Sequence, residues 1–255
     1  MSLRKALTGG KSAFVPFVMA GDPSMAVTEK IVIALEKAGA DALELGVPFS
    51  DPVADGVTVQ KAAERALAAG ATLQGVLDLV KKLRASGVKI PICLFSYLNP
   101  IYMMGYEAFI TAAKSAGAQG ALIVDLPPEE AEEYQALAKQ HGFETVFLCS
   151  PTTTPERLKL VDDYSTGFVY YVSREGVTGA QAALPAQVND RITALKQQLK
   201  NPLAIGFGIS TPEHVRALRG KADGIVVGSA LVKIIEENPA NAAEAVEQKV
   251  RALLA

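Results

Sequence analysis

The organisation of this chain is set by one stretch, Ala42-Leu43-Glu44-Leu45-Gly46-Val47-Pro48-Phe49-Ser50-Asp51-Pro52-Val53-Ala54-Asp55-Gly56. It begins as a short apolar strand with a carboxylate in its middle. Strand side chains alternate between two faces, so Leu43 and Leu45 point one way and Glu44 points the other. A carboxylate in an apolar strand is costly unless it is paired or neutral, and no Lys or Arg occurs between residues 38 and 60. The stretch favours an acid/base role for Glu44. The alternative is a Glu paired with a distant Arg, with Asp51 and Asp55 as ordinary turn residues.

Strand and helix patterns alternate on both sides of this stretch. Apolar runs bounded by Gly and Pro predict strands, and amphipathic runs with capping residues predict helices. The predicted strands cover 13–20, 42–45, 90–95, 121–125, 145–149, 168–173, 203–208 and 224–228. The predicted helices cover 25–38, 59–68, 73–85, 106–116, 127–142 and 185–200, with others opening near 155, 212 and 231. Eight such units in 255 residues predict a single α/β domain, residues 1–255, folded as a (β/α)8 TIM barrel. A doubly wound open sheet is the structural alternative.

Composition narrows the function classes. The chain is 49% hydrophobic and 20% charged, with a net charge of −2. This suits a soluble globular protein and gives no basic run for nucleic acid or an anionic membrane. No membrane span or signal peptide is indicated, so we expect a cytoplasmic protein. Cys93 and Cys149 lie in apolar runs, and we expect buried thiols. His141 and His214 lack a second ligand at metal spacing, so we expect no metal site.

The late loops predict a phosphate site. Glycines follow three neighbouring strands, in Gly176-Val177-Thr178-Gly179, Gly206-Phe207-Gly208-Ile209-Ser210 and Gly228-Ser229-Ala230. Glycine lets the backbone approach a ligand, and N–H groups at a helix N-terminus favour an anion. In barrels these loops often hold a phosphate. The alternative is three tight turns with no ligand.

An aromatic collar is predicted on the other side of the barrel mouth. Phe17, Phe49, Tyr97 and Tyr170 all lie at or near strand ends that would converge there. Together with the acids, they suit a flat, apolar, phosphorylated substrate, although each could be core alone. No Lys stands in a predicted strand, which disfavours Schiff-base chemistry. What remains is acid/base chemistry by carboxylates.

Four segments resemble the tryptophan synthase α subunit closely. They are Phe17 with Gly21-Asp22-Pro23, the stretch from Glu44 to Gly56, Ser173-Arg174-Glu175-Gly176-Val177-Thr178-Gly179, and Gly206-Phe207-Gly208-Ile209-Ser210. The resemblance implies cleavage of indole-3-glycerol phosphate to indole and glyceraldehyde 3-phosphate, with no cofactor of its own. It also implies a partner, the pyridoxal-phosphate-containing β subunit, in an α2β2 tetramer.

The resemblance carries roles to individual positions. Glu44 matches the catalytic acid/base, Asp55 the second catalytic carboxylate, and Tyr170 the tyrosine that lines the site beside them. Asp51 lies in the loop that faces the β subunit. The substrate-binding positions are Phe17, Thr178, Gly179, Phe207, Gly208, Gly228 and Ser229. We expect burial to raise the pKa of Glu44, while Asp55 stays ionised near neutral pH.

Two departures from the family pattern concern loops. Many relatives have Pro where this chain has Val57, so the loop with Asp55 is less restrained. The lead before the first strand is short, which predicts an abbreviated helix at the base of the barrel. Two rival functions stay open: another phosphate-binding barrel, such as a sugar-phosphate isomerase or indole-glycerol-phosphate synthase, and a noncatalytic barrel that only activates a β partner.

Overall fold

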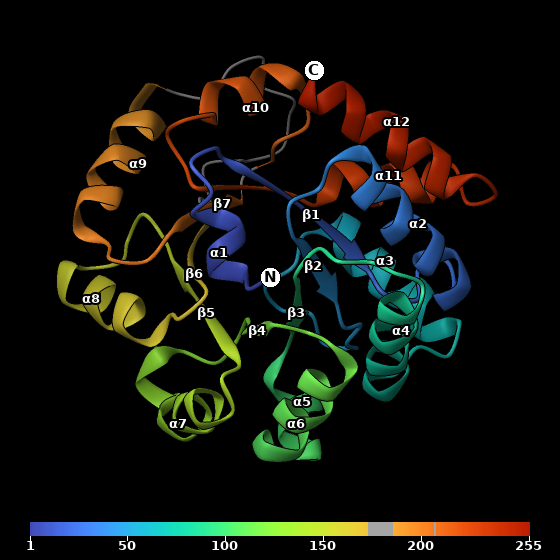
Figure 1. The fold of residues 1–255 in the computed structure, drawn as a ribbon, viewed down its shortest axis with the longest axis horizontal. Coiled ribbons are helices and arrows are strands. Elements are labelled where there is room, and N and C mark those ends of the chain that lie inside the picture. Colours follow the sequence, from blue (N-terminus) through green and yellow to red (C-terminus); the bar gives the residue numbers. More distant parts are fainter. Residues whose placement is uncertain (173–185, 207) are drawn as a thin grey trace.

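The parallel strands close into a barrel. A computed structural model describes residues 1–172, 186–206 and 208–255, and in it each strand pairs with the next while β8 returns to β1 (Figure 1). The strands are β1 Ala13–Met19, β2 Leu43–Gly46, β3 Ile92–Ser96, β4 Gly120–Ile123, β5 Glu144–Cys149, β6 Phe168–Val172, β7 Leu203–Gly206 and β8 Gly224–Val227. The predicted (β/α)8 barrel is confirmed, and the open sheet is wrong because β1 and β8 are paired.

Helices form a ring around the strands, except α1, which lies at the centre of the view in Figure 1. They are α1 Leu3–Leu7, α2 Met25–Ala38, α3 Val57–Ala68, α4 Leu73–Ala85, α5 Leu98–Met104, α6 Tyr106–Ala116, η1 Pro128–Glu130, α7 Glu132–His141, α8 Pro155–Tyr164, α9 Ala186–Gln198, α10 Pro212–Leu218, α11 Ser229–Glu237 and α12 Ala242–Leu254. Side-chain caps begin several of them: Ser24 accepts from the Val27 N–H and Thr72 from the Gly75 N–H. None of the helices in the described ranges is long and apolar enough to cross a membrane.

Strand alternation divides the core into two layers. Outward side chains such as Leu43 and Leu45 pack under the helices in the large outer cluster. Inward side chains such as Ala42, Cys93 and Tyr170 fill the barrel interior. Glu44 lies between two outward positions of β2 and therefore enters the interior, as the alternation predicts. The carboxylate is thus surrounded by barrel wall rather than by helices.

The base of the barrel, where the strands begin, is plugged by the short helix α1. Leu3 and Leu7 are each 1% exposed and join the interior cluster. The Glu144 carboxylate at the start of β5 accepts the Leu3 and Arg4 N–H groups at 2.6 and 3.0 Å, which satisfies two donors at the helix N-terminus. The abbreviated base helix predicted from the sequence is confirmed.

Several predicted boundaries are wrong for local reasons. The strand expected from residue 90 begins at Ile92, because Pro91 has no N–H for the ladder. The strand expected to reach Asp125 ends at Ile123, whose carbonyl accepts the Leu126 N–H in a turn. The helix expected over 127–142 is split into η1 and α7. Helices α5 and α12 were not predicted as separate elements.

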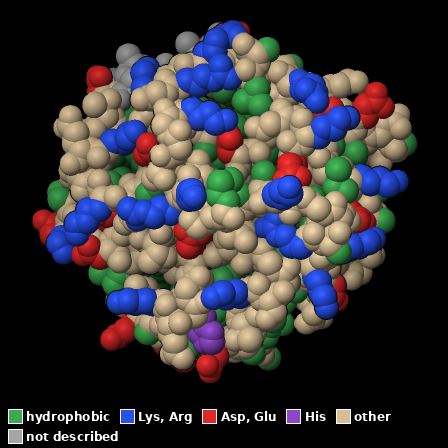
Figure 2. All heavy atoms as spheres, in the orientation of Figure 1, with side chains coloured by type: hydrophobic (Ala, Val, Ile, Leu, Met, Phe, Trp, Pro, Cys, Tyr) green, Lys and Arg blue, Asp and Glu red, His purple; other side chains and the backbone are tan. Residues whose placement is uncertain are grey.

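Basic side chains gather where several helices end. Lys37, Lys82, Lys114, Lys139 and Arg251 lie in the last turns of α2, α4, α6, α7 and α12, where a cation interacts favourably with the helix dipole. Figure 2 shows Lys and Arg spread over the visible face with Asp and Glu among them. The position of these five side chains therefore has a structural explanation.

Candidate active site

Glu44 is a buried acid without a hydrogen-bond partner. Its exposed fraction is 0%, and neither carboxylate oxygen has a hydrogen-bond partner among the described residues. Phe17 is its register partner on β1 and Cys93 its partner on β3. Burial in this apolar wall raises the pKa of Glu44 from an ordinary 4.5 to about 8, because the charged form loses its hydration. Glu44 is therefore mainly protonated at neutral pH and can donate a proton.

Asp55 lies in the loop between β2 and α3 and is half-buried. Its backbone N–H donates to the Pro52 carbonyl at 3.0 Å, and its carbonyl accepts from Gln60 Nε2 at 2.8 Å. Burial raises the pKa of Asp55 from 3.8 to about 6, while hydrogen bonding by the Tyr97 hydroxyl lowers it. The side chain stays largely ionised at neutral pH, as the sequence predicts, although the degree of burial was not expected of a polar turn.

Tyr170 stands near both acids. It projects from β6 into the interior cluster and is 9% exposed. Burial first, and then the charges of Glu44, Cys93 and Asp55, raise its pKa, so its hydroxyl stays protonated. Gly206 on the neighbouring strand makes room for the ring: a Cβ there would lie 2.6 Å from two of the ring carbons.

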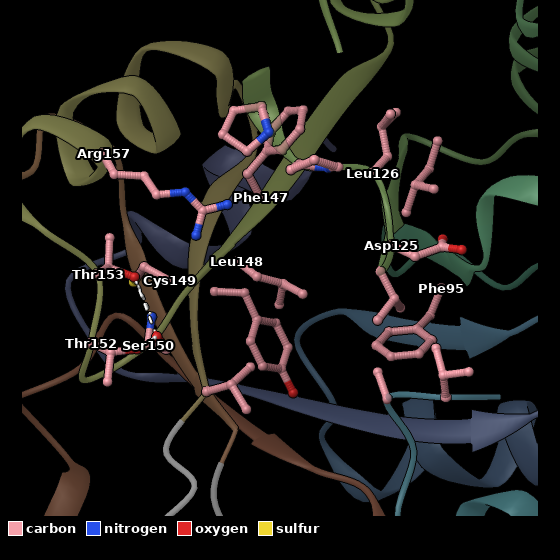
Figure 3. A pocket seen from close by; sticks show the side chains of 18 of the residues that line it. Phe95, Asp125, Leu126, Phe147, Leu148, Cys149, Ser150, Thr152, Thr153 and Arg157 are labelled. Carbon is pink, nitrogen blue, oxygen red and sulfur yellow. Dashed lines mark hydrogen bonds between the residues drawn. The ribbon is translucent and has the colours of Figure 1, made fainter. Parts of the chain in front are cut away.

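A cavity of about 970 Å³ lies at the mouth, the end where the strands finish, and Glu44 is not among the residues that line it. Asp55, Phe95 and Tyr170 line it together with residues that follow β4 and β5. Figure 3 shows Asp125 and Phe95 on one side of the cavity and Arg157 with Ser150, Thr152 and Thr153 on the other. Of the four residues predicted as a collar, only Tyr170 lines this cavity. The ring of Phe17 meets that of Phe95 edge-on with centroids 5.1 Å apart, and the ring centroids of Phe49 and Tyr97 are 5.4 Å apart. The sequence did not predict Phe95 as a site residue, although its position at the end of a predicted strand places it at the mouth.

The predicted phosphate positions lie only partly within the described residues. Gly228 and Ser229 join β8 to the N-terminus of α11, and a Cβ at Gly228 would lie 3.5 Å from Phe17. Gly208 is exposed, and a Cβ there would meet nothing within 4 Å. Backbone N–H groups at a helix start beside open space suit an anion. Three of the predicted binding residues lie outside the described residues: Thr178, Gly179 and Phe207.

A buried ion pair connects α3 to two other parts of the mouth. The Asp22 carboxylate after β1 is 1% exposed and accepts two hydrogen bonds from Arg65, both at 2.8 Å. Arg65 also donates to Glu236 at the end of α11, at 2.9 Å. This arrangement gives a structural role to Asp22 in the Gly21-Asp22-Pro23 motif.

Asp51 lies apart from the cavity. It is exposed, and its carboxylate accepts the Ser50 hydroxyl at 2.6 Å. Val53 and Val57 in the same loop are 83% and 67% exposed. Across the described part of the chain, no group of three or more His, Cys, Asp or Glu is placed to hold a metal ion. Cys93 and Cys149 are buried free thiols, as predicted.

Comparison with known proteins gives a consistent result. A family model described as tryptophan synthase alpha chain matches residues 3–254. The tryptophan synthase alpha chain of Geobacter sulfurreducens is 48% identical over 226 residues, which cover 89% of this chain and 85% of the relative. That of Laribacter hongkongensis is 47% identical over 246 residues, covering 96% and 92%.

Solved structures agree with the sequences. One is described as the structural basis of mutual activation of the tryptophan synthase a2b2 complex from Pyrococcus furiosus. It superposes with a TM-score of 0.91 at 45% identity, covering 95% of this chain and 97% of that one. Another, a mutant alpha subunit from the same organism, gives a TM-score of 0.89 at 44% identity with the same coverage. The chain therefore belongs to the tryptophan synthase alpha chain family.

Proposed function

We propose that Glu44 and Asp55 are the acid/base pair of this enzyme. As a member of its family, the chain is a carbon–carbon lyase of tryptophan biosynthesis that cleaves indole-3-glycerol phosphate to indole and glyceraldehyde 3-phosphate. The observation that carries the proposal is the contrast between the two acids. Burial holds a proton on Glu44 up to about pH 8, whereas Asp55 releases its proton near pH 6. Two acids with separated pKa values are what opposite roles require.

Glu44 begins the reaction as a general acid. It transfers its proton to C3 of the indole ring, and the ring becomes a cationic indolenine. The bond from C3 to the glycerol side chain then breaks, and its electron pair returns to the ring, so the substrate itself is the electron sink and no cofactor is needed. The adjacent glycerol hydroxyl gives up its proton as the aldehyde forms. That proton passes to the Glu44 carboxylate left by the first step, or to water.

Asp55 acts on the positive charge that the indole ring acquires when it is protonated. Its carboxylate stabilises the positive charge that develops at the indole N–H. Half-burial strengthens this interaction because a less polar environment screens charges less. Tyr170 and Phe17 form the walls against which the flat ring packs, which places C3 near Glu44.

The phosphate would bind on the side of β7 and β8. We propose that Gly228 and Ser229 supply backbone N–H groups at the start of α11 and Gly208 one from the loop after β7, with Thr178, Gly179 and Phe207 completing the site. The support is the helix N-terminus and the open space at Gly208, since such positions favour anions. Binding energy at the phosphate can then orient the distant ring.

We propose a β subunit as the partner, in an α2β2 assembly. The Pyrococcus furiosus relative is described in an a2b2 complex. The loop with exposed Asp51, Val53 and Val57 would form part of the contact, because exposed apolar side chains beside a site mark interaction surfaces. The loop also carries Asp55, so a partner that orders it would raise kcat. We further propose that residues 1–255 form one domain and act in the cytoplasm.

Turnover of indole-3-glycerol phosphate by single variants tests the assignment. Glu44→Gln keeps the shape but cannot donate a proton, and kcat should fall about 10²–10⁴-fold. Asp55→Asn should also lower kcat more than affinity. Asp51→Asn is the matched control: it should keep the isolated chain's kcat and weaken activation by an added β subunit. Near-normal turnover by Glu44→Gln would refute the mechanism, whereas no turnover by the parent chain, alone or with a β subunit, would favour a barrel that only activates its partner.

A further inference from the structure

Tyr97 occupies a junction between the barrel and the loop that carries Asp55. It follows β3 directly and is the N-cap residue of α5, and it is 2% exposed. Its ring packs 5.4 Å from Phe49, which begins the same loop. The tyrosine is therefore fixed by the barrel scaffold on one side and meets the loop on the other.

The Tyr97 hydroxyl can accept one hydrogen bond and donate another, and it has a neighbour for each. Its oxygen accepts the Ala54 N–H at 3.1 Å, which leaves its own proton to be donated. Asp55, the next residue, is the side chain whose pKa this hydroxyl lowers by hydrogen bonding. The pKa of Tyr97 is raised by burial and then by the Asp55 charge, so the hydroxyl remains a donor. The hydroxyl thus binds the backbone of one loop residue and lowers the pKa of the next one along the chain.

The Val47 N–H donates to the Phe95 carbonyl at 2.8 Å where the loop leaves β2, but the hydrogen bonds near Asp55 other than that of Tyr97 do not tie the loop to the barrel wall. Its internal hydrogen bonds join Val53 to Asp51 and Asp55 to Pro52, and these move with the loop. The Gln60 amide holds the Asp55 backbone carbonyl but belongs to the following helix α3. Tyr97 comes from a different strand, so its contact fixes the loop relative to the barrel wall.

The charged groups around Tyr97 and Asp55 favour this pairing. Asp125, which follows β4, also faces Tyr97, but its carboxylate already accepts the Leu98 N–H at 2.6 Å. Tyr170 faces Asp55 from the interior, and burial keeps Tyr170 neutral at pH 7. Asp55 is therefore the ionised side chain left to accept the Tyr97 proton.

We propose that Tyr97 is a positioning residue for the cleavage reaction: its hydroxyl fixes the Ala54–Asp55 turn to the barrel and so holds the Asp55 carboxylate toward the cavity. This inference rests on the proposed role of Asp55. It assigns a mechanistic function to a tyrosine that the sequence identified only as part of an aromatic collar.

The test is the pH dependence of kcat/KM for Tyr97→Phe in the isolated chain with indole-3-glycerol phosphate. The fall of kcat/KM on the acid side of the profile reports protonation of Asp55. Loss of the hydroxyl should move this acid limb to higher pH by about one unit, because a hydrogen bond to the carboxylate favours its charged form roughly tenfold. Since Tyr97 is buried and does not line the cavity, KM should stay within about twofold while kcat falls. Tyr134→Phe removes another buried tyrosine hydroxyl, one that has no hydrogen-bond partner among the described residues, and should leave the limb in place.

Two further measurements keep the outcomes separate. The Asp55 carboxyl carbon, identified by NMR through its loss in Asp55→Asn, should titrate at higher pH in Tyr97→Phe without any need for turnover. In an Asp55→Asn background, Tyr97→Phe should lower kcat little further. If Tyr97→Phe keeps the parent's acid limb and Asp55 titration while Asp55→Asn is impaired, the role of Tyr97 is refuted and the proposed function stands. If Asp55→Asn turns over normally, the proposed function itself fails.

Discussion

Replacing Glu44 by Gln should stabilise the fold at neutral pH while it lowers kcat about 10²–10⁴-fold. At pH 7 the parent protein must take up a proton at Glu44 when it folds, because the pKa rises from 4.5 in the unfolded chain to about 8 in the barrel. The folded state thus binds one more proton than the unfolded state between these values. Its stability therefore falls as the pH rises through this interval and levels off above pH 8.

The size of the effect follows from the width of the interval. One proton corresponds to about 1.4 kcal/mol per pH unit. Glu44 therefore costs about 3 kcal/mol at pH 7 and about 5 kcal/mol above pH 8, relative to acid solution. Glutamine has no such cost, and any penalty for burying its amide is the same at every pH. A cost of about 3 kcal/mol is a large share of a typical stability of about 5–15 kcal/mol.

Urea unfolding of both proteins between pH 4.5 and pH 8 measures the difference. With a denaturant slope of about 3 kcal/mol per molar, the midpoint of Glu44→Gln should gain about 1 M on the parent between pH 4.5 and pH 7. Asp51→Asn, which removes an exposed carboxylate, should follow the parent. Parallel curves for Glu44→Gln and the parent would show that the barrel does not hold this acid neutral.

Three further expectations concern the rest of the mouth. The kcat/KM of the isolated chain should be bell-shaped with apparent pKa values of about 6 and about 8, because the reaction needs Asp55 ionised and Glu44 protonated; a flat profile between pH 5 and pH 9 would contradict both roles. Gly208→Val should raise KM more than about tenfold through lost phosphate affinity and leave the thermal midpoint unchanged, since its side chain would meet open space; an unchanged KM would place the phosphate elsewhere. Arg65→Met should destabilise the fold by about 3–5 kcal/mol because it leaves the buried Asp22 carboxylate without its ion-pair partner. An unchanged stability in calorimetry would mean that Asp22 finds another partner.

Local signals in the sequence predicted several elements to the residue. The bounds expected for α2, α4 and α6 match the structure, because Ser24 and Thr72 cap two of the helices and Gly39 and Gly117 end two of them. Helix α12 was missed even though its buried residues recur at helical spacing. It follows α11 without a strand between them, so the alternation of strands and helices does not predict it.

The sequence predicted the position of Glu44 but not the contacts that Tyr170 and Tyr97 make, and the reason is physical. Alternation along β2 placed Glu44 in the interior, because that pattern is a property of one strand. The fit of Tyr170 over Gly206 and the contact of Tyr97 with Ala54 depend on how separate strands are staggered when the barrel closes. Spacing along the chain carries no information on that stagger, so only the closed structure shows these contacts.

The plug formed by helix α1 has a consequence for the timing of each catalytic cycle. Leu3 and Leu7 fill the base of the barrel, and Glu44 lies above them with no exposed surface. In the described part of the chain, protons can thus exchange with Glu44 only from the mouth, where substrate and products sit. A proton lost to solvent during turnover is restored only after indole and glyceraldehyde 3-phosphate have moved aside. The five residues of α1 at the base of the barrel thereby make the reprotonation of Glu44 depend on the departure of the products.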